Sequence, residues 1–386
     1  MYDRLFEPLA VAGKLTLRNR LVMAPMTTVS GELDGSFSPE EIAYLGRRAQ
    51  DGIGLVMTPA CYCHKSGHSF ERQVGCHNDS TLDGLARCAK SINANGAASF
   101  LQIHHGGNAA RSEYMGQPPL APSAVINRRG TSETPRAMTE DEIWMIIESF
   151  AMAARRAKQA GFTGIELHGA NTYLFQQFFS PFTNKRIDKW GGEKVCATCV
   201  DHQSHDSMDI CIRLENRSRF AREIVNAVRA EVGKDYPICY RISPEEPDPD
   251  GYSVRDAIAL LKMLIADGID IVHVSSWEYG VGVRDDCPIG SHPSLMIREA
   301  LPPHIPVIGV GSIVHPDQAM SVLNDGLDLV ALGRALLLDA DWTLKVRAGQ
   351  ADRLQTFLRS ESDRDHLDIP PRMREYTRRS IAVIPD

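Results

Sequence analysis

The chain has 386 residues, 43% of them hydrophobic and 24% charged, which is typical of a globular protein with a large core. Its formal net charge of −7 argues against nucleic acid as a partner, because nucleic acid requires a basic face. No apolar run approaches the ~18 residues that span a bilayer, and the start "MYDRLFEPLA" lacks a signal-peptide pattern. Nine cysteines in so long a chain fit a reducing cytoplasm better than a disulfide scaffold.

The predicted elements begin with a hairpin, and a regular series of strands and helices follows it. The stretch "VAGKLTLRNR" (11–20) carries a Gly-Lys turn between two short β-like runs. Helical patterns at 38–51, 139–161 and 253–268 each open with a Ser or Thr that can cap a helix. Several strands are continuously apolar, as expected for parallel strands covered on both faces. The predicted strands are 19–25, 53–59, 98–104, 162–168, 236–242, 269–275, 305–311 and 327–333.

Eight strand–helix units in one chain predict an α/β fold of the (β/α)₈ barrel type rather than a doubly wound sheet. The N-terminal hairpin is then placed to plug the barrel floor. No linker composition, low-complexity tract or short-period repeat divides the chain. We therefore predict a single domain over residues 1–386.

Polar residues cluster where the predicted strands end, and in such a barrel these ends form the active site. His168 ends the fourth strand, and Asn171 and Tyr173 follow it within five residues. A lone histidine at a strand end is more often a satisfied polar residue than a catalyst, so the joint placement carries the argument. Other polar residues expected at this rim are Thr27, Gln102 and Arg241.

Small residues follow the last two strands, in "GVGSI" (309–313) and "LGRALL" (332–337). Such residues leave backbone N–H groups open to a phosphate, and Arg334 can form a charged fork to it. "GVGSI" is not a dinucleotide fingerprint, because no third Gly follows at the right offset. A Gly-Arg pair is often only a turn, but its place on the same rim favours a phosphate-bearing cofactor or substrate.

Several motifs in order make the chain resemble the old yellow enzyme family of flavin-dependent ene-reductases, over nearly its whole length. The motifs are "LFEPLAVAGKLTLRNRLVMAPMTT", "LQIHHGG", "HGANTYLFQQFFSPFTNKRIDKWGG…LENRSRF", "YRIS" and "LVALGRALLLD". The resemblance implies FMN as cofactor and NAD(P)H as hydride donor. The residues it implies for FMN are Ala24, Pro25, Met26 and Thr27 along the flavin ring, Ala60 and Gln102 at its pyrimidine edge, Arg241 near N1/C2, and Gly311, Ser312, Gly333 and Arg334 at the phosphate.

The resemblance also implies catalytic and substrate-binding roles for the residues after the fourth strand. His168 and Asn171 are similar to the pair that donates hydrogen bonds to the substrate's carbonyl oxygen, where enolate-like charge develops. Tyr173 is similar to the proton donor to the α-carbon, and an ordinary phenol pKa of about 10 keeps it protonated at neutral pH. Many relatives carry a second histidine where this chain has Asn171, and both side chains donate.

The segment 193–213 interrupts the family's usual "GGSLENR" run and is predicted to be an insertion in the fourth βα loop. It is placed either to shade the substrate or to meet a neighbouring subunit of a homo-oligomer.

The same insertion holds cysteines and histidines, and zinc prefers thiolate and imidazole ligands. The four candidates are crowded into ten residues, which favours incidental thiols and predicts no metal. These candidates are Cys196, Cys199, His202 and His205, with Cys211 further on.

Residues 350–386 form a C-terminal extension, and its Arg-rich part 370–380 is predicted to be a solvated basic end.

The expected function is reduction of activated C=C bonds of small α,β-unsaturated carbonyl compounds, with nitro compounds or quinones as other acceptors. One alternative is a flavin-free lyase or isomerase acting on a phosphorylated substrate. Another is a degenerate barrel that serves as a redox sensor or binding module.

Overall fold

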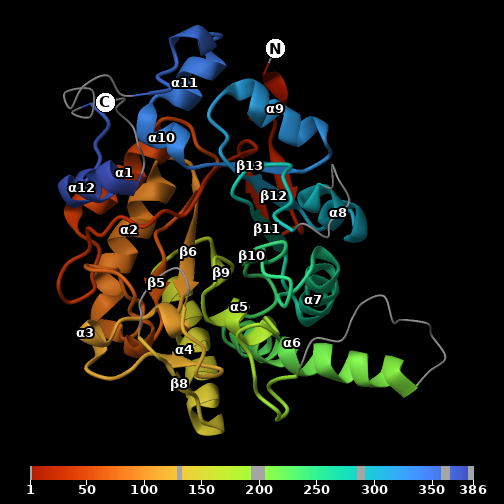
Figure 1. The fold of residues 1–386 in the computed structure, drawn as a ribbon. Coiled ribbons are helices and arrows are strands. Elements are labelled where there is room, and N and C mark those ends of the chain that lie inside the picture. The colour runs from red at the N-terminus through yellow and green to blue at the C-terminus, as the bar shows by residue number, and fades with distance from the viewer. Residues whose placement is uncertain (1, 128–132, 193–204, 285–291, 358–365, 381–386) are drawn as a thin grey trace.

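The computed structural model describes residues 2–127, 133–192, 205–284, 292–357 and 366–380 (Figure 1). Eight parallel strands close into a barrel, because β4 pairs with β3 on one side and with β6 on the other. Every strand overlaps one of the eight predicted segments, so the predicted barrel is confirmed. The strands are β3 (Leu21–Met23), β4 (Leu55–Met57), β6 (Ala98–His104), β9 (Gly164–Gly169), β10 (Ile238–Ile242), β11 (Ile271–Ser275), β12 (Val307–Val310) and β13 (Leu329–Leu332).

Helices cover the outside of the barrel (Figure 1), and their ends follow the predicted capping chemistry. The side chain of Ser38 accepts a hydrogen bond from the first turn of α1, and capping boxes begin α4 at Thr139 and α7 at Ser253. Helix α7 ends at Gly268, whose φ of 112° a side chain would oppose. The helices are α1 (Pro39–Gln50), α2 (Leu82–Ala94), α3 (Ser112–Met115), α4 (Glu140–Gln159), α5 (Leu174–Phe179), α6 (His205–Val232), α7 (Val254–Asp267), α8 (Pro293–Ala300), α9 (Pro316–Asn324), α10 (Arg334–Leu338), α11 (Trp342–Arg347) and α12 (Pro371–Ser380).

The N-terminal hairpin closes the barrel floor. Its strands β1 (Leu9–Val11) and β2 (Leu15–Leu17) pair antiparallel. Val11 and Leu17 are buried in one cluster with side chains from the barrel strands, which include Leu55, Ile271, Ile308 and Leu329. Of the three further short strands in the described residues, β5 (Cys61–Tyr62) pairs with β6 of the barrel sheet. The other two, β7 (Leu120–Ala121) and β8 (Arg136–Ala137), pair with each other.

The predicted insertion is partly helical. Helix α6 begins at His205, and Figure 1 shows its first turns extending away from the barrel. Cys196, Cys199 and His202 lie outside the described residues, so the prediction about zinc stays a prediction.

Part of the C-terminal extension packs against the core, so the prediction of a solvated basic end holds only in part: the side chain of Arg372 is 52% exposed, but Met373 beside it is buried. Met373 of α12 is fully buried, and Leu367 and Ile369, which precede α12, are nearly so. Arg47 of α1 pairs with Asp368 of this extension, at 2.7 Å between Nη1 and Oδ2.

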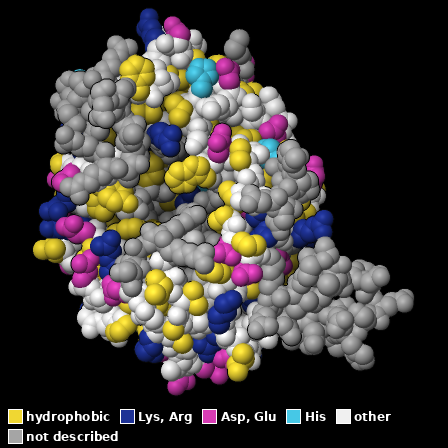
Figure 2. Space-filling model, in the orientation of Figure 1, with side chains coloured by type: hydrophobic (Ala, Val, Ile, Leu, Met, Phe, Trp, Pro, Cys, Tyr) yellow, Lys and Arg dark blue, Asp and Glu magenta, His cyan; other side chains and the backbone are white. Residues whose placement is uncertain are grey.

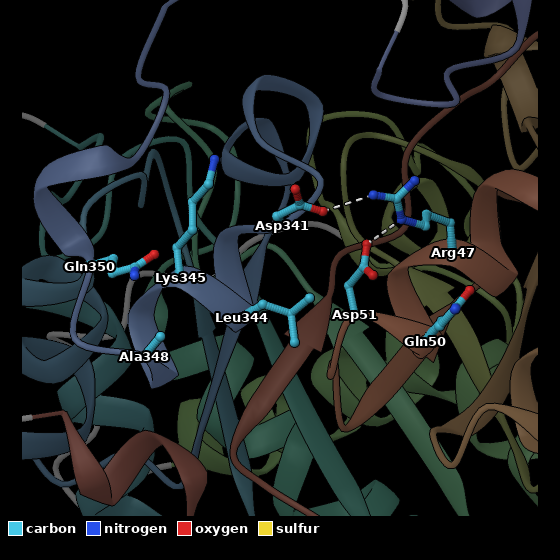
Figure 3. Close-up of a pocket in the computed structure, with 8 residues that line it drawn as sticks. All are labelled: Arg47, Gln50, Asp51, Asp341, Leu344, Lys345, Ala348 and Gln350. Carbon is cyan, nitrogen blue, oxygen red and sulfur yellow. Dashed lines mark hydrogen bonds and ion pairs between the residues drawn. The ribbon is translucent and has the colours of Figure 1, made fainter.

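Arg47 also lines a small pocket between α1 and α11 (Figure 3). Arg47 pairs there with Asp51, at 2.6 Å, and with Asp341, at 2.8 Å. Asp51 precedes β4, so this pocket lies at the floor side of the barrel. The position argues for a structural ion-pair cluster rather than an active site.

Among the described residues, no helix is long and apolar enough to cross a membrane. On the face drawn in Figure 2, the coloured Lys and Arg side chains are interspersed with Asp and Glu rather than gathered into a basic patch.

One buried carboxyl group predicts a pH dependence of stability. Burial raises the pKa of Glu41 to about 7, although a hydrogen bond with Thr28 opposes the shift. The folded-state pKa lies above the unfolded value of 4.5, so the folded protein holds the Glu41 proton more tightly than the unfolded chain does. The stability that comes from the protonated carboxyl is complete below pH 4.5 and is lost as pH rises through 7. The loss amounts to about 3 kcal/mol.

We therefore expect Glu41→Gln to gain stability relative to the wild-type protein as pH rises from 5 to 8. Melting temperatures of both proteins at the two pH values measure this gain. An equal difference at pH 5 and pH 8 would contradict the assignment.

Candidate active site

Neighbouring strands place three basic side chains in one row at the barrel rim. The register pairs His168 of β9 with Arg241 of β10, and Arg241 with His273 of β11. All three are buried, with His168 4% and Arg241 8% exposed. The row brings together a predicted catalytic residue and a predicted flavin contact.

His168 is a neutral hydrogen-bonding group. Burial, followed by the charge of Arg241, holds its pKa well below the ordinary value for histidine. Its Nδ1 atom is buried and has no hydrogen-bond partner among the described residues. A buried polar atom without a partner is costly, and a bound ligand would satisfy it.

Asn171 is held by two neighbouring strands. Its φ of 60° lies in the left-handed region, which Asn tolerates better than most residues. Its backbone N–H donates to Ser243 Oγ at 3.0 Å, and its Oδ1 accepts from Ser275 Oγ at 3.1 Å. Because Oδ1 is occupied, the amide NH₂ is left to donate to a ligand.

Tyr173 lies against His168. Its ring meets the His168 ring edge-on, with the centroids 5.0 Å apart, and the His104 ring edge-on at 4.3 Å. Phe70 adds a third edge contact at 6.3 Å. The phenol ring is therefore fixed by aromatic packing beside the imidazole.

The residues predicted along the flavin ring follow β3. The N–H of Ala24 donates to the carbonyl of Leu332 at 2.9 Å, which ties the first barrel strand to the last. A Cβ added at Gly333 would lie 3.4 Å from Met26 Sδ, so this predicted phosphate residue sits against the ring segment. Pro25 is buried, and Thr27 is half-buried.

The remaining predicted cofactor residues border the same end of the barrel. The carbonyl of Ala60 accepts from Gln73 Nε2 at 2.9 Å. Gly311 has φ +149°, and a Cβ there would lie 2.3 Å from the backbone nitrogen of Tyr279, so only Gly fits. Ser312 has a positive φ of 49°, and Arg334 opens α10 with an exposed side chain.

A polar layer inside the barrel was not predicted. Glu166 is fully buried, and its carboxylate accepts hydrogen bonds from Gln102 Nε2 and from His273 Nδ1, each at 2.7 Å. The signal in the sequence is the spacing of Glu166 and His168, which puts both on the same face of one strand.

A cavity of about 690 Å³ beside Asn171 was also not predicted. It lies between the loops that follow β9, β10 and β11, where Ser243 and Ser275 line it. Trp277 borders it with a side chain that is 85% exposed. A cavity of this size holds a small organic molecule.

These side chains fit FMN. The guanidinium of Arg241 is buried, and its Nε has no partner among the described residues. Its charge acts on Glu166, whose carboxylate accepts a hydrogen bond from the amide of Gln102. A guanidinium and an amide suit the carbonyl and imide groups of a flavin edge. Gly311 and Ser312, both at positive φ, keep backbone close to the rim where a phosphate would lie.

Comparison with known proteins gives the same assignment. Residues 4–195 and 213–353 match the NADH:flavin oxidoreductase / NADH oxidase family. The break between the two matched stretches falls where the insertion 193–213 is predicted.

Similar proteins include two bacterial oxidoreductases. The chain is 33% identical over 374 residues to the probable NADH-dependent flavin oxidoreductase YqiG of Bacillus subtilis (strain 168), which covers 96% of this chain and 95% of that protein. It is 35% identical over 380 residues to the NADH:fumarate oxidoreductase of Klebsiella pneumoniae (strain 342), covering 95% of this chain but only 38% of that longer protein.

Among solved structures, morphinone reductase has a TM-score of 0.77 at 27% identity, covering 93% of this chain and 92% of that one. A complex of 2-naphthoyl-CoA reductase has a TM-score of 0.78 at 27% identity, covering 92% of this chain and 54% of that one.

FMN is therefore the cofactor, and a reduced nicotinamide is its source of hydride. The chain thus belongs to the NADH:flavin oxidoreductase / NADH oxidase family, as its resemblance to old yellow enzymes predicted, and it is a flavin-dependent oxidoreductase.

Proposed function

We propose that this enzyme reduces the activated C=C bond of small α,β-unsaturated carbonyl compounds. The observation that carries the proposal is the grouping of neutral His168, oriented Asn171 and packed Tyr173 at one point of the rim. FMN, when bound, supplies the hydride that it has received from NAD(P)H. The chain's own residues bind the substrate, orient it and move the proton.

His168 and Asn171 bind the carbonyl oxygen of the substrate. Both donate hydrogen bonds, and the negative charge on this oxygen grows as hydride reaches the β-carbon. Fixed donors aimed at growing charge stabilise the transition state more than the ground state. The packing of His168 and the contact of Asn171 with Ser275 hold the donors in place before substrate arrives.

Tyr173 completes the reduction by giving its phenolic proton to the α-carbon. Its ring lies against His168. The proton donor can therefore reach the α-carbon of the same substrate whose carbonyl oxygen is bound by His168 and Asn171. Separation of these two tasks explains why an imidazole, an amide and a phenol follow one strand.

The cavity beside Asn171 accommodates the rest of the substrate. Phe182 and Val281 contribute apolar surface, and Trp277 offers an indole that a flat substituent can stack on. Nitro compounds and quinones carry similarly polarised acceptor oxygens and are further candidate substrates.

Cofactor contacts are assigned in the same proposal. Arg241 lies near N1/C2, where positive charge favours the reduced flavin, and Gln102 faces the pyrimidine edge with Ala60. The ring is bordered by Ala24, Pro25, Met26 and Thr27, and the phosphate by Gly311, Ser312, Gly333 and Arg334.

Anaerobic stopped-flow mixing tests the function. Protein reduced with NADH or NADPH should be reoxidised by 2-cyclohexenone, with one equivalent of the saturated ketone formed per flavin. Reduced protein that reacts with oxygen or quinones but leaves every enone unchanged would refute the proposed substrate class.

A further inference from the structure

The polar layer inside the barrel contains a carboxylate that the proposed reaction does not use. Glu166 Oε1 accepts from Gln102 Nε2 at 2.7 Å, and Oε2 accepts from His273 Nδ1 at 2.7 Å and from Cys239 Sγ at 3.4 Å. Each of these four side chains is buried. A buried carboxylate is costly unless donors surround it, so the presence of Glu166 in this layer calls for a role.

Glu166 is ionised in this layer. Burial acts to raise its pKa, but the hydrogen bond from His273, the charge of Arg241 and the hydrogen bond from Gln102 together hold the pKa below the ordinary value. Burial lowers the pKa of His273, so the imidazole is neutral and its Nδ1–H donates. Arg241 is then the cation that balances Glu166.

An ionised carboxylate only accepts hydrogen bonds, and this fixes the amide of Gln102. Its NH₂ must point at Glu166, so its Oε1 points the other way. The pyrimidine edge of a flavin presents one imide N–H donor between two carbonyl acceptors. Gln102 is therefore set to accept from that N–H.

The register places the charge of Glu166 close to the flavin-facing guanidinium. Glu166 pairs with Cys239 across β9 and β10, and Arg241 lies two residues further along β10 on the same face. The carboxylate therefore offsets part of the positive charge that Arg241 offers to the reduced flavin.

We propose that Glu166 is a positioning residue that orients Gln102 toward the flavin N3–H and moderates Arg241, thereby setting the affinity for FMN and its midpoint potential. This inference rests on the proposed placement of FMN over Gln102 and Arg241. It concerns the binding and the redox potential of the cofactor, and not the binding of the substrate.

Glu166→Gln tests it. We expect the dissociation constant of FMN to rise about 10-fold, since one oriented hydrogen bond is lost. We expect the midpoint potential to shift to a more positive value, because the anionic reduced flavin then meets an uncompensated Arg241. Glu166→Asp keeps the charge and should hold the potential near the wild-type value. An unchanged dissociation constant and potential in Glu166→Gln would overturn the proposal.

Asp270→Asn is the matched control. Asp270 is a buried carboxylate that pairs with Lys14 at 2.6 Å and Arg229 at 2.9 Å, next to the start of β11 and so at the barrel floor. Loss of its charge should lower the melting temperature but leave the flavin potential unchanged. A shift as large as that of Glu166→Gln would show a general effect of charge loss and would also overturn the proposal.

If Glu166→Gln does not fold, the wild-type apoprotein gives the answer with FMN methylated at N3. Loss of the N3–H should weaken binding at least about 10-fold. Binding as tight as that of FMN would refute the orientation of Gln102. If the proposal about Glu166 is wrong, the wild-type enzyme still reduces enones. If the proposed function is wrong, the wild-type protein binds FMN normally but does not reduce enones.

Discussion

Tyr173→Phe should slow reoxidation of the reduced flavin by an enone about 10²-fold, which is the scale of a positioned general acid. Reduction of the flavin by NAD(P)H should keep its wild-type rate, because the phenol proton serves only the second half-reaction. Phe retains the ring that packs against His104 and His168, so the pocket is preserved. Anaerobic stopped-flow measurements of the two half-reactions separate these effects.

The matched control is Tyr114→Phe. Tyr114 is a half-buried tyrosine that stacks on His68 at 4.6 Å and has no part in the proposed reaction. Both half-reactions should be unchanged in this variant. If Tyr173→Phe instead slows both half-reactions equally, Tyr173 has a structural role and the proton-donor assignment is wrong.

The double variant His168→Ala/Asn171→Ala should lose at least about 10²-fold in affinity for phenolic ligands, which mimic the enolate over oxidised flavin. Two hydrogen bonds to a charged oxygen are removed, and each contributes about 1.5–3 kcal/mol. Titration of the long-wavelength charge-transfer band measures the affinity. An unchanged titration curve would eliminate the donor pair.

Two further measurements sharpen this test. Ser275→Ala removes only the contact that orients Asn171, so it should weaken phenol binding less than the double variant does. The pKa of His168 is held well below the ordinary value by burial, so the imidazole should not titrate between pH 6 and 8. Over that range, phenol affinity should follow the ionisation of the ligand alone.

Local sequence patterns were sufficient to predict the barrel. Buried strands such as β3 and β13 are continuous apolar runs, and helices such as α4 begin at recognisable caps. Strand ends then placed His168, Asn171 and Tyr173 on one rim without any knowledge of register. Those features depend on residues that are close together in the chain.

Features that depend on distant residues were missed. The contact of Ser275 with Asn171 joins β11 to the loop after β9, and that of His273 with Glu166 joins β11 to β9. Neither partner is visible from the other's neighbourhood in the sequence. The burial of Met373 was missed for a related reason, because its arginine neighbours suggested a solvated tail.

The hairpin at the barrel floor determines how the cofactor is loaded. Val11 and Leu17 fill the floor, and Lys14 fastens the hairpin to Asp270 at 2.6 Å. With this end sealed by packed side chains, FMN enters and leaves through the rim, on the side where the substrate also arrives. Cofactor exchange therefore needs no opening of the floor, where Val11 and Leu17 stay packed among the barrel side chains.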